Sequence, residues 1–491
     1  MDFDPKRTPG PGGAEDAPRS ELDCCQSHVG LWGHGQGLVN CPQAISRQEP
    51  EPGTEEPGTR NCGAIVHFLS RFLVPSSVFL SRGSIGYGMA SGIPGTLAMD
   101  VWKQMRTELD ALEAEDLLRR PAEVDSPCRP VVRVGGREVV CLCSNDYLSL
   151  AADPAIRAAA IQAVGQWGVG AGASRLVSGT QSPHALLERR LAQFKRAEAA
   201  IVTSTGWMAN HVAIHALAGA GDLVLSDKLN HASILDAALA CGARVRTYPH
   251  RDTARLRKLL DAHRAAAKRC LIVTDSLFSM DGDLAPLGEL AELKKRYDAV
   301  LMIDEAHATG VLGKSGRGAA ELLGVEGDVD VVVGTLSKAL GSLGGFVAGP
   351  AVLVETIRNR GRAFIYTTAP PAALCAAALA ALEIVEREPQ RRGRLLELAA
   401  ALREQLAAAG LAPTPDPREP ATPIVPIVVG EPARAVQLSR GLLEEGFLVP
   451  AIRPPTVPRG TSRLRVSLSA GHTPEQLARF VEMLRRRMPG P

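Results

Sequence analysis

Two largely apolar runs, residues 299–303 and 329–333, each stop at a group of polar side chains, and this pattern constrains the fold more than any other. Apolar runs of this length are typical of strands that are buried on both faces of a parallel α/β sheet. The polar residues that follow them are Asp304, His307, Thr335 and Lys338. Because ligands of such sheets bind at the carboxyl ends of the strands, we expect these side chains to meet at one crevice.

The lysine and the aspartate of this crevice indicate chemistry with an aldehyde cofactor. Lys338 follows its strand in a turn rich in Ser, Gly and Ala, where burial would lower the pKa of its amine and let it form a Schiff base. Asp304 suits the pyridine nitrogen of pyridoxal phosphate (PLP), which it would keep protonated. A surface lysine and a helix-capping aspartate are the plainer interpretation of each residue alone. The pair on adjacent strand ends favours a PLP site.

A second pattern in the same segment indicates nucleotide hydrolysis instead. Residues 308–315, ATGVLGKS, resemble a loose phosphate-binding loop, and residues 304–307 spell the DEAH of nucleic-acid motor ATPases. A true phosphate-binding loop leaves a strand directly, opens a helix and precedes its acidic strand. Here the acid comes first and Ala308 replaces the first glycine. This order disfavours an ATPase.

Composition and charge exclude several other classes of protein. The 491 residues can form two or more domains with a large core, and a net charge of +2 gives no signal for a nucleic-acid partner. The Cys24–Cys25 and Cys141/Cys143 pairs lack metal-ligand spacing, so we expect no metal site and unpaired thiols in a reducing cytoplasm. No apolar run approaches the ~18 residues of a membrane-spanning helix, so we expect no membrane partner.

The first 98 residues differ from the rest of the chain. Gly and Pro make up 25 of these 98 residues, which argues against a packed domain. Our hypothesis is that residues 1–98 result from an over-called start, with Met99 or Met89 as the natural first residue. The alternative is a genuine disordered extension.

The remaining sequence predicts an α/β fold with a smaller second domain. Strand–polar–helix units begin near residues 201, 223, 271 and 299, which is typical of a doubly wound, mostly parallel sheet. Further predicted elements are a helix at 99–120 with Leu109, Leu112 and Leu117 on one side, strands at 130–134 and 138–142, helical residues 371–409, and strands near 424–429, 447–452 and 463–468. The predicted divisions are an N-terminal helix with strands (99–140), a large PLP-binding domain (141–385) and a small C-terminal domain (386–491).

Several motifs, taken in their order along the chain, resemble one family. Lys338 lies in VVGTLSKALGSLGG and Asp304 in MIDEAHATGVLG, and both motifs are preceded by CSNDYLSL and DKLNHAS. Together they resemble the PLP-dependent α-oxoamine synthases over roughly residues 99–488. The resemblance implies a fold-type I PLP enzyme, an acyltransferase that works as a homodimer with shared active sites.

The same resemblance implies roles for individual residues. Lys338 would carry the cofactor and act as general base, Asp304 would contact the pyridine nitrogen, and His231 would stack on the pyridine ring. Ser279 and His307 would contact the phenolate oxygen of the cofactor. The other positions that match cofactor-binding residues are Gly206 and Trp207 at the start of a helix that can hold the phosphate, Thr335, and Thr367 and Thr368, whose hydroxyls would reach the phosphate of the partner subunit.

One C-terminal segment, AIRPPTVPRG, bears on the substrate. Arg453 can clamp a carboxylate with two N–H groups. Its Arg-Pro-Pro-Thr-Val-Pro context resembles the branch of the family that condenses L-alanine with a pimeloyl thioester, carried on coenzyme A or on an acyl carrier protein, in biotin biosynthesis. Asn145 and Arg119 match residues near the substrate, although Arg119 also fits a solvated helix end. Arg463 and Arg465 are expected to support their strand.

Two alternatives to this function remain open at the level of sequence. The first is a sister α-oxoamine synthase that uses glycine and a short acyl-coenzyme A, such as glycine C-acetyltransferase (2-amino-3-ketobutyrate ligase). The second is a catalytically silent scaffold, which would lack the cofactor lysine.

One departure from the family pattern is Ser149, which stands where glycine is usual and whose effect we expect to be local to a turn.

Overall fold

The computed structural model describes residues 100–488, all of which belong to the second of two units into which the chain divides, Gly95–Pro491. The predicted extension at 1–98 and the two candidate first residues therefore lie outside the described residues. Among the residues that the structure describes, no helix combines the length and the apolar character needed to cross a membrane.

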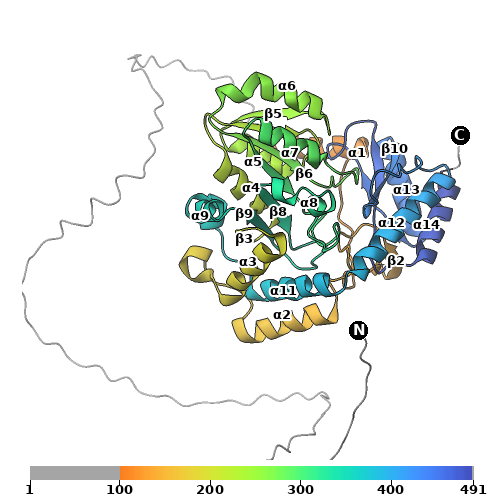
Figure 1. Ribbon diagram of the computed structural model, residues 1–491. Coiled ribbons are helices and arrows are strands. Elements are labelled where there is room, and N and C mark those ends of the chain that lie inside the picture. The colour runs from red at the N-terminus through yellow and green to blue at the C-terminus, as the bar shows by residue number, and fades with distance from the viewer. Residues whose placement is uncertain (1–99, 489–491) are drawn as a thin grey trace, which may run out of the picture. The chain divides into compact units, whose positions relative to one another are not determined.

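A seven-stranded sheet forms the centre of the fold (Figure 1). Its strands, in spatial order, are β3 (Ala199–Thr203), β9 (Gly345–Gly349), β8 (Val331–Thr335), β7 (Val300–Asp304), β6 (Cys270–Asp275), β4 (Leu223–Asp227) and β5 (Arg244–Tyr248). Only β9 runs antiparallel to its neighbours. This arrangement confirms the predicted mostly parallel α/β sheet, whereas β5 and β9 were not anticipated.

Apolar side chains of the central strands alternate between two core clusters, one on each face of the sheet. In β6, Ile272 belongs to one cluster and Leu271 and Val273 to the other, as expected for a strand covered on both sides. One face is covered by α4 (Gly206–Leu217), α5 (Ala232–Ala240), α9 (Ala351–Arg360) and α10 (Arg362–Ile365). The opposite face is covered by α3 (Ser182–Lys195), α6 (Thr253–His263), α7 (Leu287–Arg296) and α11 (Ala372–Arg387), with α2 (Pro154–Trp167) packed on α11.

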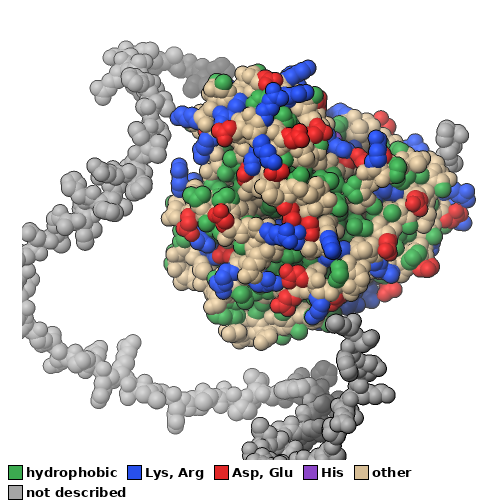
Figure 2. Space-filling model, viewed as in Figure 1, with side chains coloured by type: hydrophobic (Ala, Val, Ile, Leu, Met, Phe, Trp, Pro, Cys, Tyr) green, Lys and Arg blue, Asp and Glu red, His purple; other side chains and the backbone are tan. Residues whose placement is uncertain are grey.

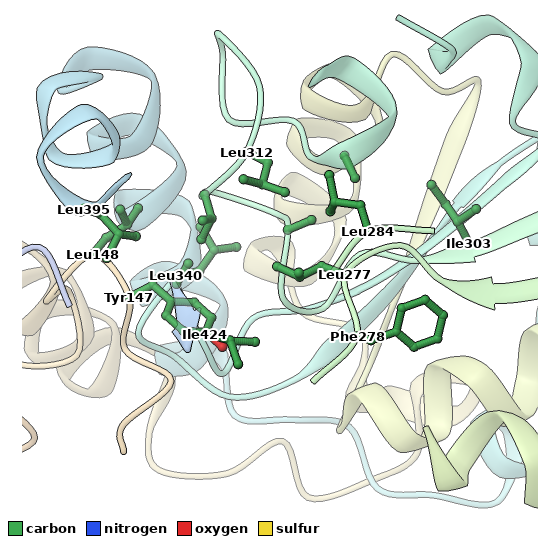
Figure 3. Close-up of a cluster of buried hydrophobic side chains, with 14 of the residues drawn as sticks. Tyr147, Leu148, Leu277, Phe278, Leu284, Ile303, Leu312, Leu340, Leu395 and Ile424 are labelled. Atoms are coloured by element: carbon green, nitrogen blue, oxygen red, sulfur yellow. The ribbon is translucent and has the colours of Figure 1, made fainter. Parts of the chain in front are cut away.

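The larger core cluster continues into the C-terminal region of the chain. Leu395 of α12 (Gln390–Ala408) and Ile424 of β10 (Ile424–Gly430) belong to the same cluster as Leu277 and Phe278, which follow β6 (Figure 3). The remaining elements of this region are α13 (Pro432–Glu444), α14 (Pro474–Arg487), β12 (Ala451–Ile452) and β13 (Ser462–Ser467). The predicted domain boundaries at 140 and 385 stay predictions.

Two predicted elements are each divided by a proline. The strand expected at 447–452 consists of β11 (Phe447–Leu448) and β12, which join different sheets on either side of Pro450. The helical stretch expected at 371–409 is broken before Pro389 into α11 and α12. Proline lacks the N–H that a ladder or a helix needs and disfavours helical dihedrals in the residue before it.

The N-terminal helix is shorter than the sequence predicts. The predicted helix spans 99–120, but α1 ends at Ala114 and has no buried residue, and Asp116 adopts a φ of 55°. Leu117 is buried beyond the end of the helix, so the expected leucine face does not form. The strands predicted nearby are confirmed as β1 (Val131–Val134) and β2 (Arg137–Cys141), which pair in a sheet with β11.

Ser149 shows why glycine suits its position. Its φ of 56° lies in the left-handed region, which glycine adopts without a steric cost. The hydroxyl of Ser149 lies 2.5 Å from that of Ser469 and accepts the Gly471 N–H at 3.1 Å. Contrary to the expectation from the sequence, the effect of Ser149 is therefore not confined to its turn, because its hydroxyl also bonds residues that follow β13.

Candidate active site

A cavity of about 180 Å³ lies where β7 and β8 end side by side, since Asp304 and Val333 are paired in register. The predicted site residues that line it are Gly206, Trp207, His231, Ser279, Asp304, His307, Thr335 and Lys338. The strand ends and the start of α4 thus bring eight predicted residues together. The cavity is completed by Asn210, Ser233, Asp275, Ala306, Gly334 and Ser337, none of which was among the predicted site residues.

The amine of Lys338 is prepared for nucleophilic and base chemistry. Burial lowers the pKa of Lys338 to about 8, although Asp304 and Asp275 act in the opposite direction. Its Nζ lies 2.8 Å from Nε2 of His307. Burial, together with the positive charges of Lys338 and Arg465, holds the pKa of His307 well below its ordinary value. A neutral imidazole at this place can accept a hydrogen bond from the amine of Lys338.

A chain of hydrogen bonds continues from His307 to more distant segments. Nδ1 of His307 lies 2.6 Å from the hydroxyl of Tyr147, which is fully buried. This hydroxyl can donate to Oδ1 of Asn145 at 3.2 Å, and the guanidinium of Arg465 donates to the same oxygen at 3.2 Å. If Nε2 of His307 accepts from Lys338, its Nδ1–H donates to Tyr147, and every group in the chain is satisfied.

Tyr147 and Arg465 are therefore site residues that sequence reasoning missed. Tyr147 lies two residues after Asn145 in CSNDYLSL, but its contact with His307 spans 160 positions and has no signal in local spacing. Arg465 was expected only to support β13. It also donates to the carbonyl of Ser279, and so joins the segment after β6 to Asn145.

The carboxylate of Asp304 is held in a fixed orientation at the cavity wall. Its Oδ2 accepts from Nδ2 of Asn210 at 2.7 Å, and its Oδ1 accepts from the N–H of Ala306 at 2.7 Å. Oδ1 of Asn210 is buried without a partner. Burial, reinforced by the charge of Asp304, raises the pKa of Asp275 well above its ordinary value, which favours the protonated form of Asp275.

An imidazole and an indole form one side of the cavity. His231 caps α5, with its Nδ1 2.7 Å from the Ser233 hydroxyl, and its ring centre lies 5.9 Å from that of Trp207. Burial lowers the pKa of His231, which favours the neutral ring. A neutral aromatic ring at the wall of a cavity can stack on a planar ligand.

The start of α4 offers the cavity a binding site for an anion. The N–H groups of Gly206 and Trp207 belong to the first turn, where a helix has no internal acceptors. The backbone of Gly345 approaches so closely that a Cβ there would overlap Thr205 and Gly206. Glycine at 345 is thus required for the start of α4 to reach this place. The Ser337 hydroxyl, 2.6 Å from that of Thr335, adds a further polar group.

Five predicted residues do not line this cavity: Arg119, Asn145, Thr367, Thr368 and Arg453. Arg119 donates to the carbonyls of Pro454 at 3.0 Å and Arg453 at 3.4 Å, so the two arginines lie together. Nε of Arg453 is buried without a partner, and burial, with Arg119 nearby, lowers the pKa of Arg453. Two adjacent guanidinium groups with an unpaired donor are suited to an anionic ligand.

The groups around the cavity fit PLP. They supply an amine with a lowered pKa for the aldehyde, a fixed carboxylate for the pyridine nitrogen, an imidazole for the ring and a helix start for the phosphate. Within residues 100–488, His, Cys, Asp and Glu do not gather in threes in a way that could hold a metal ion. The fold and this site together define a PLP-dependent enzyme of fold type I.

Comparison with known proteins identifies the family. The chain belongs to the aminotransferase class I and II family, whose model matches residues 137–484, and within it to the 8-amino-7-oxononanoate synthases. The 8-amino-7-oxononanoate synthase of Anaeromyxobacter dehalogenans is 52% identical over 383 residues, which cover 78% of this chain and 94% of that protein. The predicted family is therefore confirmed.

Solved structures agree with this placement. A serine palmitoyltransferase variant from S. paucimobilis with bound PLP and myriocin has a TM-score of 0.75 and 31% identity, and the match covers 80% of this chain and 98% of that one. The 8-amino-7-oxononanoate synthase of Francisella tularensis has a TM-score of 0.61 and 29% identity, covering 71% of this chain and 97% of that one. The fold and the PLP cofactor are confirmed by these relationships.

Proposed function

We propose that this protein condenses L-alanine with a pimeloyl thioester and releases carbon dioxide and the free thiol, giving 8-amino-7-oxononanoate for biotin biosynthesis. The observation that carries the proposal is the 52% identity to an 8-amino-7-oxononanoate synthase, which covers 94% of that protein. The cavity supports it, because Lys338, Asp304 and His231 all border one space. The thioester is carried on coenzyme A or on an acyl carrier protein.

The residues of the cavity would divide the work of the reaction among them. PLP, when bound, supplies an aldehyde that captures amines and a ring that withdraws electrons. Lys338 holds the cofactor at rest and takes the proton from Cα of alanine, for which a pKa near 8 is suitable. Asp304 would keep the pyridine nitrogen protonated, and His231 would cover the ring. His307 and Ser279 would orient the phenolate oxygen, and Thr335, Gly206 and Trp207 would bind the phosphate.

Arginine residues and a second subunit would complete the site. Arg453 and Arg119 would bind the carboxylate of the substrate, in line with the unpaired Nε of Arg453, and Asn145 would lie near the substrate. Thr367 and Thr368 lie outside the cavity of their own chain, which fits a role at the phosphate of the partner subunit in a homodimer.

A cytoplasmic location is part of the same proposal. On the face shown in Figure 2, basic and acidic side chains are interspersed, which fits small-molecule substrates better than a nucleic acid.

An absorbance spectrum tests the proposal and separates it from the glycine-using alternative. We expect a band near ~420 nm when Lys338 holds PLP, and a shift of this band on addition of L-alanine but not of glycine. A shift with glycine alone would move the protein to a sister branch of the family. A protein that shows no band after addition of PLP would be a scaffold, contrary to the proposal.

Replacement of Tyr147 by phenylalanine tests the hydrogen-bond chain. Without the hydroxyl, Nδ1 of His307 loses its buried partner, which costs about 1–3 kcal/mol of folding stability. Because His307 then no longer holds the amine of Lys338 in place, we expect a kcat lower by roughly tenfold to a hundredfold. The position of the ~420 nm band and its pH dependence should change as well, because the partner of Lys338 is no longer fixed. Tyr297→Phe, which removes an exposed hydroxyl bonded to Asp261, is the matched control. If Tyr147→Phe and Tyr297→Phe have the same kcat, the hydrogen-bond chain has no role in catalysis.

A further inference from the structure

The thiols of Cys141 and Cys143 touch in the folded protein. Their sulfur atoms lie 3.7 Å apart, a contact that the alternation of side chains along a strand explains, since residues two apart share a face. Cys141 ends β2 and is buried, and Cys143, two residues later, is half-buried. Both are free cysteines, and the reaction proposed above uses neither.

The two cysteines differ in how firmly their backbone is held. The N–H of Cys141 donates to the carbonyl of Pro130 at 2.8 Å, and its carbonyl lies 3.1 Å from Nε2 of His472. Leu142 adds two further backbone bonds, to Leu448 at 3.0 Å and from Ser467 at 2.8 Å. Cys143 follows this anchored segment, so we expect Cys143 to shift more than Cys141 when the two sulfurs approach each other.

The contact between the sulfurs also favours the reactive form of one thiol. A hydrogen bond from Cys143 lowers the pKa of Cys141 to about 6, although burial acts in the opposite direction. The thiolate is the nucleophile in thiol–disulfide exchange. The pair therefore combines a thiolate with a second sulfur in contact with it.

We propose that Cys141 and Cys143 are a modification site that reacts with low-molecular-weight disulfides to form a disulfide bond. The thiolate of the pair attacks one sulfur of the external disulfide, forms a mixed disulfide and expels one thiol. The second cysteine then attacks the protein-bound sulfur and expels the other thiol. Two protein thiols are oxidised, the external disulfide is reduced to two thiols, and the protons of the cysteines pass to the two departing thiols.

The disulfide would act on the active site through Asn145. A disulfide bond is about 2.05 Å long, so the sulfurs must approach by about 1.7 Å, and we expect the resulting shift of Cys143 to reach Asn145, two residues further along the chain. Oδ1 of Asn145 binds Tyr147 and Arg465, and Tyr147 binds His307, the partner of Lys338. We expect oxidation to lower turnover at least fivefold; this consequence rests on the proposed function, whereas the disulfide itself does not.

Treatment of the full-length protein with glutathione disulfide, followed by peptide mapping, tests the site. We expect a Cys141–Cys143 linkage, detected as the loss of two hydrogens from the peptide that contains both residues, and its reversal by dithiothreitol. A map in which these residues stay reduced, or in which Cys143 is linked to the exposed Cys128 instead, overturns the proposal.

Serine variants separate the disulfide from other effects of oxidation. Cys141→Ser lacks the attacking thiolate, so it should keep its activity under glutathione disulfide, while the control Cys241→Ser, which removes a half-buried thiol at the end of α5, should lose activity as the unmodified protein does. Cys143→Ser lacks the second thiol, so its peptide map should show Cys141 joined to glutathione and no internal linkage. Should Cys141→Ser fail to fold, the map of Cys143→Ser alone decides the matter. Loss of activity in a folded Cys141→Ser variant contradicts the link to turnover. A mapped linkage in a protein without synthase activity would refute the proposed function and leave the modification site intact.

Discussion

Replacement of Lys338 by alanine is expected to lower turnover by well over ~10³-fold, because the substitution removes both the group that holds the cofactor and the group that moves the proton. The ~420 nm band should disappear even when PLP is supplied. The measurement is kcat with L-alanine and a pimeloyl thioester, together with the spectrum. A variant that keeps a substantial share of the activity would contradict the assignment of Lys338.

The control for this experiment is Lys314→Ala, which also addresses the ATPase interpretation. Lys314 is the lysine of the loop-like sequence ATGVLGKS, and a phosphate-binding loop would need it. We expect this variant to retain its synthase activity.

In the protein without cofactor, an amine-reactive reagent should modify Lys338 with a midpoint near pH 8, because only the neutral amine reacts.

Replacement of Lys195 by methionine is expected to lower the free energy of unfolding by about 3–5 kcal/mol, the usual cost of leaving a buried charge without its partner. Nζ of Lys195 lies 2.6 Å from Oε2 of Glu305 and 2.8 Å from the hydroxyl of Thr309, and it also contacts the carbonyl of Arg317. The side chains of Lys195 and Glu305 are only 2% and 1% exposed. Without Lys195, the carboxylate of Glu305 stays buried and unpaired.

Urea unfolding of the variant and of a matched control measures this effect. Lys295→Met breaks the ion pair with Asp328, which has the same 2.6 Å length but lies at the surface, so its cost should stay below about 1 kcal/mol. The double variant Lys195→Met with Glu305→Leu should recover much of the loss, because it removes both charges. Similar losses in the two single variants would show that burial does not determine the value of the Lys195–Glu305 pair.

Local patterns in the sequence predicted the strands of the site and the residues at their ends. Asp304 and Lys338 follow largely apolar runs, and these runs are the signal that strands buried on both faces produce. The predicted family supplied the match of His231, Ser279 and Gly206 to the same cavity. Each of these residues belongs to a short motif, so that its neighbours along the chain identify it.

Contacts between distant segments could not be predicted in the same way. Glu305 lies within the DEAH sequence, but its partner Lys195 comes 110 residues earlier, and Tyr147 and Arg465 are 318 residues apart. Neither pair leaves a period or a spacing in the sequence. The strand β9 was missed for a different, local reason: its sequence GFVAG has glycines at both ends, and glycine is uncommon in strands.

The hydrogen-bond chain from Arg465 to Lys338 has a consequence for the order of events during synthesis of the protein. Asn145 and Tyr147 emerge from the ribosome first, His307 and Lys338 follow much later, and Arg465 comes last, in β13. A nascent chain that stops short of β13 can contain the lysine, but not the guanidinium at the far end of the chain. The finished catalytic arrangement is therefore a late product of translation.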